Sequence, residues 1–201
     1  ALESFTSRSY REEVVKRVFE RYEQVLRESN AVDFDDLLMW AVRLFDENAD
    51  IREAYSRRFE HVLVDEFQDT NLAQYELLKH LSSFHHSLFL VGDEDQSIYR
   101  WRGADYRNVL RFQSDYPQAV KLLLEQNYRS TQNVLNAAQS VIDRNHARTR
   151  KNLFSERGRG ALVTLYEAVD DHGEAAYVVE DIIERLGGGE KPGEIAVMYR
   201  T

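Results

Sequence analysis

Two adjacent carboxylates, Asp65 and Glu66, directly follow the short apolar run 61–64. A strand ending there would deliver both side chains to one edge of a sheet. Mg²⁺ prefers oxygen ligands and keeps part of its water shell, so one carboxylate could hold it. The other could orient and deprotonate an attacking water. A strand that simply ends in solvated acids would show the same pair, so the pattern needs support from its neighbours.

A second segment, GDEDQSIYRWRGA at 92–104, follows the next apolar run. In it, Tyr99 and Trp101 alternate with Arg100 and Arg102. Aromatic faces stack on bases while arginines reach phosphates, which is how single strands are gripped without sequence preference. The alternative is that both aromatic rings fill the core beside a salt-bridged turn, since large aromatic side chains are usually buried.

A third segment, LEQNYRS at 124–130, also follows an apolar run. Its Arg129 could reach the γ-phosphate of a nucleotide bound by the preceding α/β unit, stabilising charge in the transition state. Its Tyr128 could stack on a nucleobase. The alternative is a helical ion pair between Glu125 and Arg129, worth a few tenths of a kcal/mol.

Short apolar runs alternate with amphipathic segments along the chain, and this alternation predicts a parallel sheet covered on both faces. In such sheets ligands lie outside the carboxyl ends of the strands, where all three segments begin. Asp33 is the expected N-cap of a helix of about 14 residues. The other expected helices cover 10–28, 50–58, 71–81, 105–114, 131–144 and 173–186, and the expected strands cover 61–64, 88–91, 120–124, 161–167 and 194–199.

The composition excludes some classes of protein. The 201 residues contain no cysteine, so disulfides and thiolate metal sites are excluded. The sequence has no apolar run of the roughly 18 residues that a membrane helix needs, and we expect a cytoplasmic protein without membrane contact. The formal net charge of −9 argues against non-specific DNA binding, unless the DNA contact is local.

Together the three segments resemble motifs of UvrD-like superfamily 1 DNA helicases. DEFQDTN at 65–71 resembles their motif II (Walker B), 92–104 resembles motif III, and 124–130 resembles motif IV. DFDDLL at 33–38 and IAVMYRT at 195–201 are weaker echoes, and the resemblance covers nearly the whole chain. It implies an α/β fold, a parallel sheet with flanking helices, in an incomplete RecA-like (P-loop NTPase) helicase core.

The resemblance also implies roles at an ATP site. Asp65 would coordinate Mg²⁺ and Glu66 would be the catalytic base. Gln96 would sense the γ-phosphate and couple it to the DNA. Tyr128 would stack on adenine, and Arg129 would contact the γ-phosphate.

On the DNA side, the resemblance implies that Tyr99 and Trp101 stack on single-stranded bases, with Arg102 supporting that contact. Arg100 departs from the family pattern, where close relatives more often have a small residue. The partner would be single-stranded or partly duplex DNA, along which the parent protein moves 3′ to 5′ with ATP and Mg²⁺ as cofactors.

The phosphate-binding pattern G-x-x-x-x-G-K-[ST] does not occur in the sequence. The family places it upstream, so we expect an internal fragment of a longer helicase, inactive by itself and able to self-associate through unpaired strands. Residues 1–30 would be the return helix from an inserted accessory domain. Residues 31–125 would be the later half of the first RecA-like domain, and residues 126–201 would bridge to and begin the second.

Two alternatives stay open. The chain could be a stand-alone DNA-binding module without ATPase activity, which its acidic charge and missing phosphate loop favour. It could also belong to a recombination helicase–nuclease subunit, whose motifs II and III are similar. The pathway (repair, plasmid replication or recombination) is open as well.

Overall fold

The computed structural model describes residues 9–145 and 149–199. The chain divides into two compact units. The first comprises residues 1–123 with 146–150, and the second comprises residues 124–145 with 151–201. Each unit is described by itself below.

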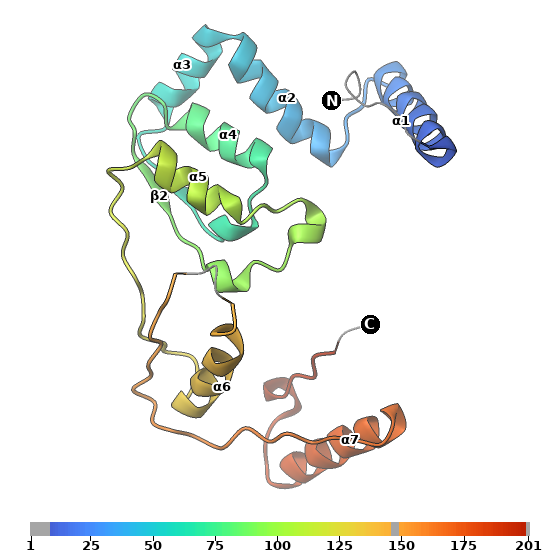
Figure 1. The fold of residues 1–201 in the computed structure, drawn as a ribbon, viewed down its shortest axis with the longest axis vertical. Helices are drawn as coiled ribbons and strands as arrows, with labels where there is room; N and C mark the ends of the chain where they lie inside the picture. The colour runs from blue at the N-terminus through green and yellow to red at the C-terminus, as the bar shows by residue number, and fades with distance from the viewer. Residues whose placement is uncertain (1–8, 146–148, 200–201) are drawn as a thin grey trace. The chain divides into compact units, whose positions relative to one another are not determined.

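The first unit begins with helices whose starts are specified by local side-chain caps. At the start of α2, Asp33 Oδ1 accepts a hydrogen bond from Asp36 N at 2.8 Å, and Asp36 Oδ2 accepts one from Asp33 N at 3.3 Å. This reciprocal capping confirms the predicted N-cap. The helices α2, α3 and α4 pack together (Figure 1). The helices of this unit are α1 (Tyr10–Glu28), α2 (Phe34–Glu47), α3 (Ala49–Arg58), α4 (Leu72–Leu81) and α5 (Arg107–Asp115).

Two short strands, β1 (Val62–Val64) and β2 (Leu88–Leu90), form a parallel pair in which Leu63 lies opposite Phe89. The predicted parallel sheet with flanking helices is therefore confirmed. The prediction that both faces are covered is wrong for the described residues, because Leu63 and Phe89 are 72% and 59% exposed on one face. Their neighbours along each strand, on the opposite face, are partly buried.

The core of the first unit gathers around Phe67, which lies just after β1 in the 3-10 turn η1 (Phe67–Asp69). Its ring lies 6.0 Å from the ring of Tyr75 on α4 and 6.1 Å from that of Phe112 on α5. The Tyr75 hydroxyl donates to Asp115 Oδ2 at 2.8 Å, and burial and this carboxylate raise the pKa of Tyr75. Aromatic contacts therefore join the two helices to the end of β1.

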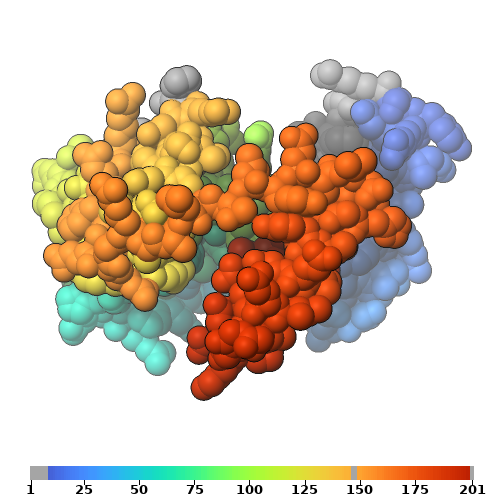
Figure 2. Space-filling view, turned by 90° about the horizontal axis from the view of Figure 1, so that it is seen from below, coloured from blue at the N-terminus to red at the C-terminus, as the bar shows by residue number. Residues whose placement is uncertain are grey.

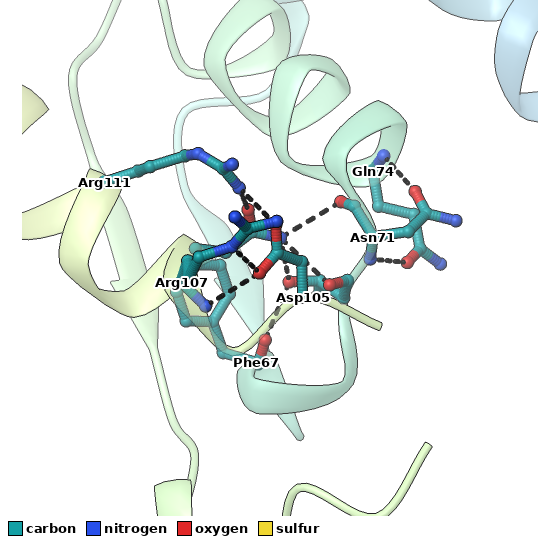
Figure 3. A network of polar contacts seen from close by, with 8 residues as sticks. Phe67, Asn71, Gln74, Asp105, Arg107 and Arg111 are labelled. Carbon is teal, nitrogen blue, oxygen red and sulfur yellow. Dashed lines mark hydrogen bonds and ion pairs between the residues drawn. The ribbon is translucent and has the colours of Figure 1, made fainter. Parts of the chain in front are cut away.

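A buried polar network joins the same region to the start of α5 (Figure 3). The Asn108 side chain is fully buried, and its Nδ2 donates to Thr70 O at 2.9 Å and to Asn71 O at 3.2 Å. The Asp105 amide also donates to Thr70 O, at 3.0 Å. The Arg111 guanidinium closes the network by donating to Asn108 Oδ1 at 2.6 Å and to Asp105 Oδ2 at 2.9 Å.

The second unit contains α6 (Gln132–Ile142), α7 (Asp171–Gly187) and the 3-10 turn η4 (Pro192–Glu194). The segment after residue 151 lies along the start of α6, because Gln126 bridges to Phe154 and Asn133 Nδ2 donates to Gly160 O at 3.0 Å. The gold surface of α6 and the orange surface of residues 151–160 adjoin in Figure 2. The rings of Tyr166 and Tyr177 stack 3.9 Å apart and hold the next segment to α7.

Three predicted strands are wrong. Residues 120–124, 161–167 and 194–199 form no ladder, although each run is largely apolar. A strand needs a partner backbone within hydrogen-bonding distance. Val120 and Leu122 instead line a cavity of about 320 Å³ whose other walls include Leu90. The apolar pattern of these runs predicts burial, but no backbone segment among the described residues forms a ladder with them. The seven predicted helices all form, with ends shifted by a few residues.

We expect residues 1–201 to self-associate in solution. The two-stranded sheet has unpaired outer edges within the described residues, and Leu63 and Phe89 form an exposed apolar face on it. Light scattering over a concentration series should show species larger than a monomer. Leu63→Lys with Phe89→Lys should shift the distribution toward monomer, and a monodisperse wild-type monomer would contradict the expectation.

We expect Asp105 to make the first unit acid-labile. Arg107 donates to its Oδ1 at 2.7 Å, and with Arg111 this holds the pKa of the carboxyl well below its usual range. A depressed folded-state pKa stabilises the fold fully above the unfolded value of about 4, and the stabilisation declines as the pH falls from there through the folded-state pKa. Asp105→Asn should therefore lower the free energy of unfolding by about 1–3 kcal/mol at pH 7 and by clearly less at pH 2.

Urea unfolding at the two pH values measures this difference. Glu53→Gln is the matched control, because Glu53 pairs with Arg57 at 2.6 Å but both side chains are more than half exposed. An exposed pair of this kind contributes about 0.5 kcal/mol. Equal losses for the two variants at pH 7 would show that the Asp105 network adds nothing beyond a surface ion pair.

Candidate functional site

The carboxylate pair lies where β1 ends and the backbone turns sharply. Asp65 Oδ1 accepts from Glu66 N at 2.9 Å, and Glu66 adopts a left-handed conformation with φ of 50°. Such a conformation is unfavourable for a non-glycine residue and concentrates at functional sites. Both carboxylates are exposed, as predicted for acids at the carboxyl edge of a parallel sheet.

The neighbouring Gln68 links this turn to the loop after β2. Its side chain is only 1% exposed. The Gln68 Nε2 donates to Glu66 Oε2 at 2.7 Å, and Gln68 Oε1 accepts from Asp93 N at 2.9 Å. A Cβ at Gly92 would lie 2.8 Å from Gln68 Oε1, so the close approach of the two loops requires glycine there.

The loop after β2 continues into the 3-10 turn η2 (Glu94–Gln96), which is capped by Asp93. The Gln96 Nε2 donates to Asp93 Oδ2 at 2.9 Å. The structure therefore brings Glu66 and Gln96 into one chain of hydrogen bonds through Gln68 and Asp93. The sequence singles out Glu66 and Gln96 but not Gln68, whose only signal is an amide that follows the carboxylate pair and precedes the third acid of the same motif.

The second predicted segment forms an exposed aromatic loop. Trp101 is 74% exposed in the 3-10 turn η3 (Arg100–Arg102), and Tyr99 just before it is 39% exposed. The Arg102 guanidinium lies 4.6 Å from the Trp101 ring centre and 5.3 Å from that of Tyr99, within cation–π range. The alternative in which both rings fill the core is wrong. The loop ends at Gly103, whose φ of 88° suits glycine.

Tyr128 and Arg129 lie in the second unit, in an irregular loop before α6. Tyr128 is 76% exposed and donates through its hydroxyl to Gln126 Oε1 at 2.9 Å. The Arg129 backbone N–H donates to Asn127 Oδ1 at 2.9 Å, and its side chain is exposed. The alternative of a helical pair with Glu125 is wrong, because residues 127–130 are not helical.

The donor set at the end of β1 fits Mg²⁺. Within residues 9–145 and 149–199, no cluster of three or more His, Cys, Asp or Glu side chains could hold a metal ion by protein ligands alone. Mg²⁺ in nucleotide sites needs only one or two carboxylates, with water and phosphate supplying the other oxygens. Asp65 offers such a carboxylate, and the nearby Asp69 Oδ1 is a buried acceptor without a hydrogen-bond partner in the described part of the chain.

The described residues contain no helix that is both long and apolar enough to cross a membrane. The candidate site consists of acidic and amide groups on the turn after β1 and an aromatic–arginine group on the loop after β2.

Two family models match the chain in succession. Residues 1–117 match the UvrD/REP helicase N-terminal domain, and residues 122–201 match the UvrD-like helicase C-terminal domain. The first match covers the carboxylate pair, Gln68, Gln96 and the aromatic loop, and the second covers Tyr128 and Arg129.

Curated relatives agree with the family models. The chain is 45% identical over 192 residues to a Staphylococcus epidermidis protein named ATP-dependent DNA helicase PcrA, and 44% identical over 192 residues to the Staphylococcus aureus protein of that name. Each alignment covers 96% of this chain but 26% of the relative, so the chain spans about a quarter of their length. The two family matches, which together cover almost the whole chain, show that the chain belongs to the UvrD-like helicase family.

Proposed function

We propose that the protein containing this chain is an ATP-dependent DNA helicase or translocase that moves 3′ to 5′ on single-stranded DNA. The observation that carries the proposal is the pairing of β1 with β2. It sets two loops side by side at one sheet edge, one beginning with the Asp65–Glu66 pair and the other leading to the exposed Trp101. A nucleotide-hydrolysis group and a DNA-stacking group are thereby attached to neighbouring strands.

At the nucleotide, Asp65 would hold Mg²⁺, which screens the phosphate charge when bound. Glu66 would orient the attacking water and accept its proton. Gln96 would sense the γ-phosphate. From the second unit, Tyr128 would stack on adenine and Arg129 would contact the γ-phosphate. The exposure of both side chains supports these roles.

At the DNA, Tyr99 and Trp101 would stack on successive bases. The Arg102 guanidinium lies over both rings, so it would stabilise their orientation and add positive charge near the phosphates. The local character of this contact agrees with the net charge of −9, because the grip would come from one loop rather than from a basic face.

The phosphate-binding loop with its lysine would lie outside residues 1–201, which would then not hydrolyse ATP alone. We retain the assignment of residues 1–30 to a helix returning from an accessory domain. Residues 31–125 would be the later half of the first RecA-like domain, and residues 126–201 would lead into the second. Cytoplasmic location and a role in DNA repair belong to the same proposal.

Glu66→Gln in the full-length protein should leave ATP binding intact and lower kcat by about 10²–10⁴-fold, because the water loses its base. Steady-state ATPase assays with single-stranded DNA, together with nucleotide-binding titrations, measure both quantities. Glu60→Gln is the control, since Glu60 is an exposed glutamate just before the opposite end of β1. Unchanged turnover in Glu66→Gln would refute the base assignment and with it the proposed function.

Trp101→Ala should weaken single-stranded DNA binding by roughly 5–150-fold, as expected from the loss of about 1–3 kcal/mol of base stacking. Fluorescence anisotropy with a labelled oligonucleotide measures the change. Trp40→Ala is a matched control, because Trp40 is also exposed and lies 4.8 Å from the guanidinium of Arg43, but on α2. Equal losses in the two variants would remove the DNA role from the aromatic loop.

A further inference from the structure

We propose that Gln68 is a positioning residue that fixes the Glu66 carboxylate according to the state of the loop that carries Gln96. The inference rests on the proposed function, since it concerns how the hydrolysis base is held. It assigns a role to a side chain that does not itself reach the reacting atoms. The basis is the unbroken hydrogen-bond chain from Glu66 through Gln68 and Asp93 to Gln96.

The first link restrains a side chain that is otherwise free to move. Glu66 is exposed and lies on a sharp turn, so its carboxylate has many orientations open to it. Gln68 Nε2 donates to Glu66 Oε2 at 2.7 Å, which leaves Glu66 Oε1 available to a water. A base must be held close to its productive geometry, because a misplacement of about 1 Å can cost about 10²-fold in rate.

The second link fixes the direction of the amide. Gln68 Oε1 accepts from the backbone N–H of Asp93, while Gln68 Nε2 faces the Glu66 carboxylate. Turning the amide over would set its oxygen against a carboxylate and its NH₂ group against an N–H. Both contacts would then be repulsive, so a glutamine satisfies this position in one orientation. Because the side chain is 1% exposed, water does not substitute for either partner.

The third link connects this chain of hydrogen bonds, called the Gln68 relay below, to Gln96, the proposed phosphate sensor. Gln96 Nε2 donates to Asp93 Oδ2 at 2.9 Å, and the Gln96 backbone N–H donates to Asp93 O at 2.9 Å. A movement of the 93–96 turn therefore moves the Asp93 amide, which moves the Gln68 side chain and then the Glu66 carboxylate. The base would be correctly oriented only when the sensor turn is in place.

Gly92 provides a second, independent handle on the relay. A Cβ there would approach Gln68 Oε1 to 2.8 Å, closer than real Cβ contacts allow, whereas the backbone contacts at Phe67 N (3.3 Å) and Gln68 N (3.4 Å) are tight but are relieved by a shift of a few tenths of an ångström. Gly92→Ala should thus act mainly by displacing the Gln68 amide. If the amide is already absent, the same substitution should have little left to disturb.

The test uses the full-length protein and measures kcat and KM for ATP with saturating single-stranded DNA. Gln68→Met keeps the side-chain length and packing but removes the side-chain hydrogen bonds to Glu66, Asp69 and Asp93. It should lower kcat by about 10–100-fold. The KM for ATP should change less than threefold, because Gln68 does not contact the nucleotide. Gly92→Ala should lower kcat in the same direction, again with little change in KM.

Gln74→Ala is the matched control. Gln74 is another glutamine of this region, but its Oε1 accepts from Asn71 N at 2.8 Å and completes the capping box at the start of α4. It should lower stability in urea unfolding while leaving kcat unchanged. This separates loss of stability from loss of base orientation, since a purely structural Gln68 would behave as Gln74 does.

A double-mutant cycle decides whether the two handles act on one relay. Gln68→Ala with Gly92→Ala should be no slower than Gln68→Ala alone, within about twofold. Multiplicative losses would overturn the relay, as would a wild-type kcat in Gly92→Ala, even if Gln68→Met does not fold. Glu66→Gln is assayed in parallel: if it is slow while Gln68→Met and Gly92→Ala match wild type, the inference fails and the proposed function stands.

Discussion

The parallel pairing of β1 with β2 is the constraint on which the site depends. The ladder is short, with Leu63 opposite Phe89 at its centre. Just beyond it, Val91 N donates a further backbone hydrogen bond to Val64 O at 2.8 Å. Because parallel strands end at the same edge, the turn after β1 and the loop after β2 are forced together. A shift of this register would separate the carboxylate pair from the turn that carries Gln96.

Because this ladder is short, buried amide side chains add further hydrogen bonds between the segments that follow the two strands. Gln68 ties the start of the loop after β2 to the turn after β1, and Asn108 ties the far end of that loop to Thr70. A buried primary amide is costly unless its donors and acceptors are paired, so each stabilises one arrangement of the backbone rather than many. Between these two anchors the chain is free to expose Trp101, which a fully packed loop would bury.

Much of the local structure follows from short-range rules. The capping pair at Asp33 and the apolar periodicity of the helices predict seven helices correctly, because caps and helical spacing act within a few residues. The predicted strands at 120–124, 161–167 and 194–199 do not form, since a strand exists only where another backbone pairs with it. The apolar pattern records that these runs favour burial, but it does not supply the partner.

The sequence by itself determined the family of this chain and the identity of the groups at the site, because motif spacing fixes which residues follow each strand. It also indicated that Tyr99, Trp101 and Arg102 act as a set, but it left a core role open. Only the tertiary structure decided that the rings are exposed beneath a guanidinium, and that Gln68 joins Glu66 to the opposite loop. The physical reason is that hydrogen bonds and solvent exposure depend on which distant segments the strand pairing brings together, and spacing along one segment does not contain that information.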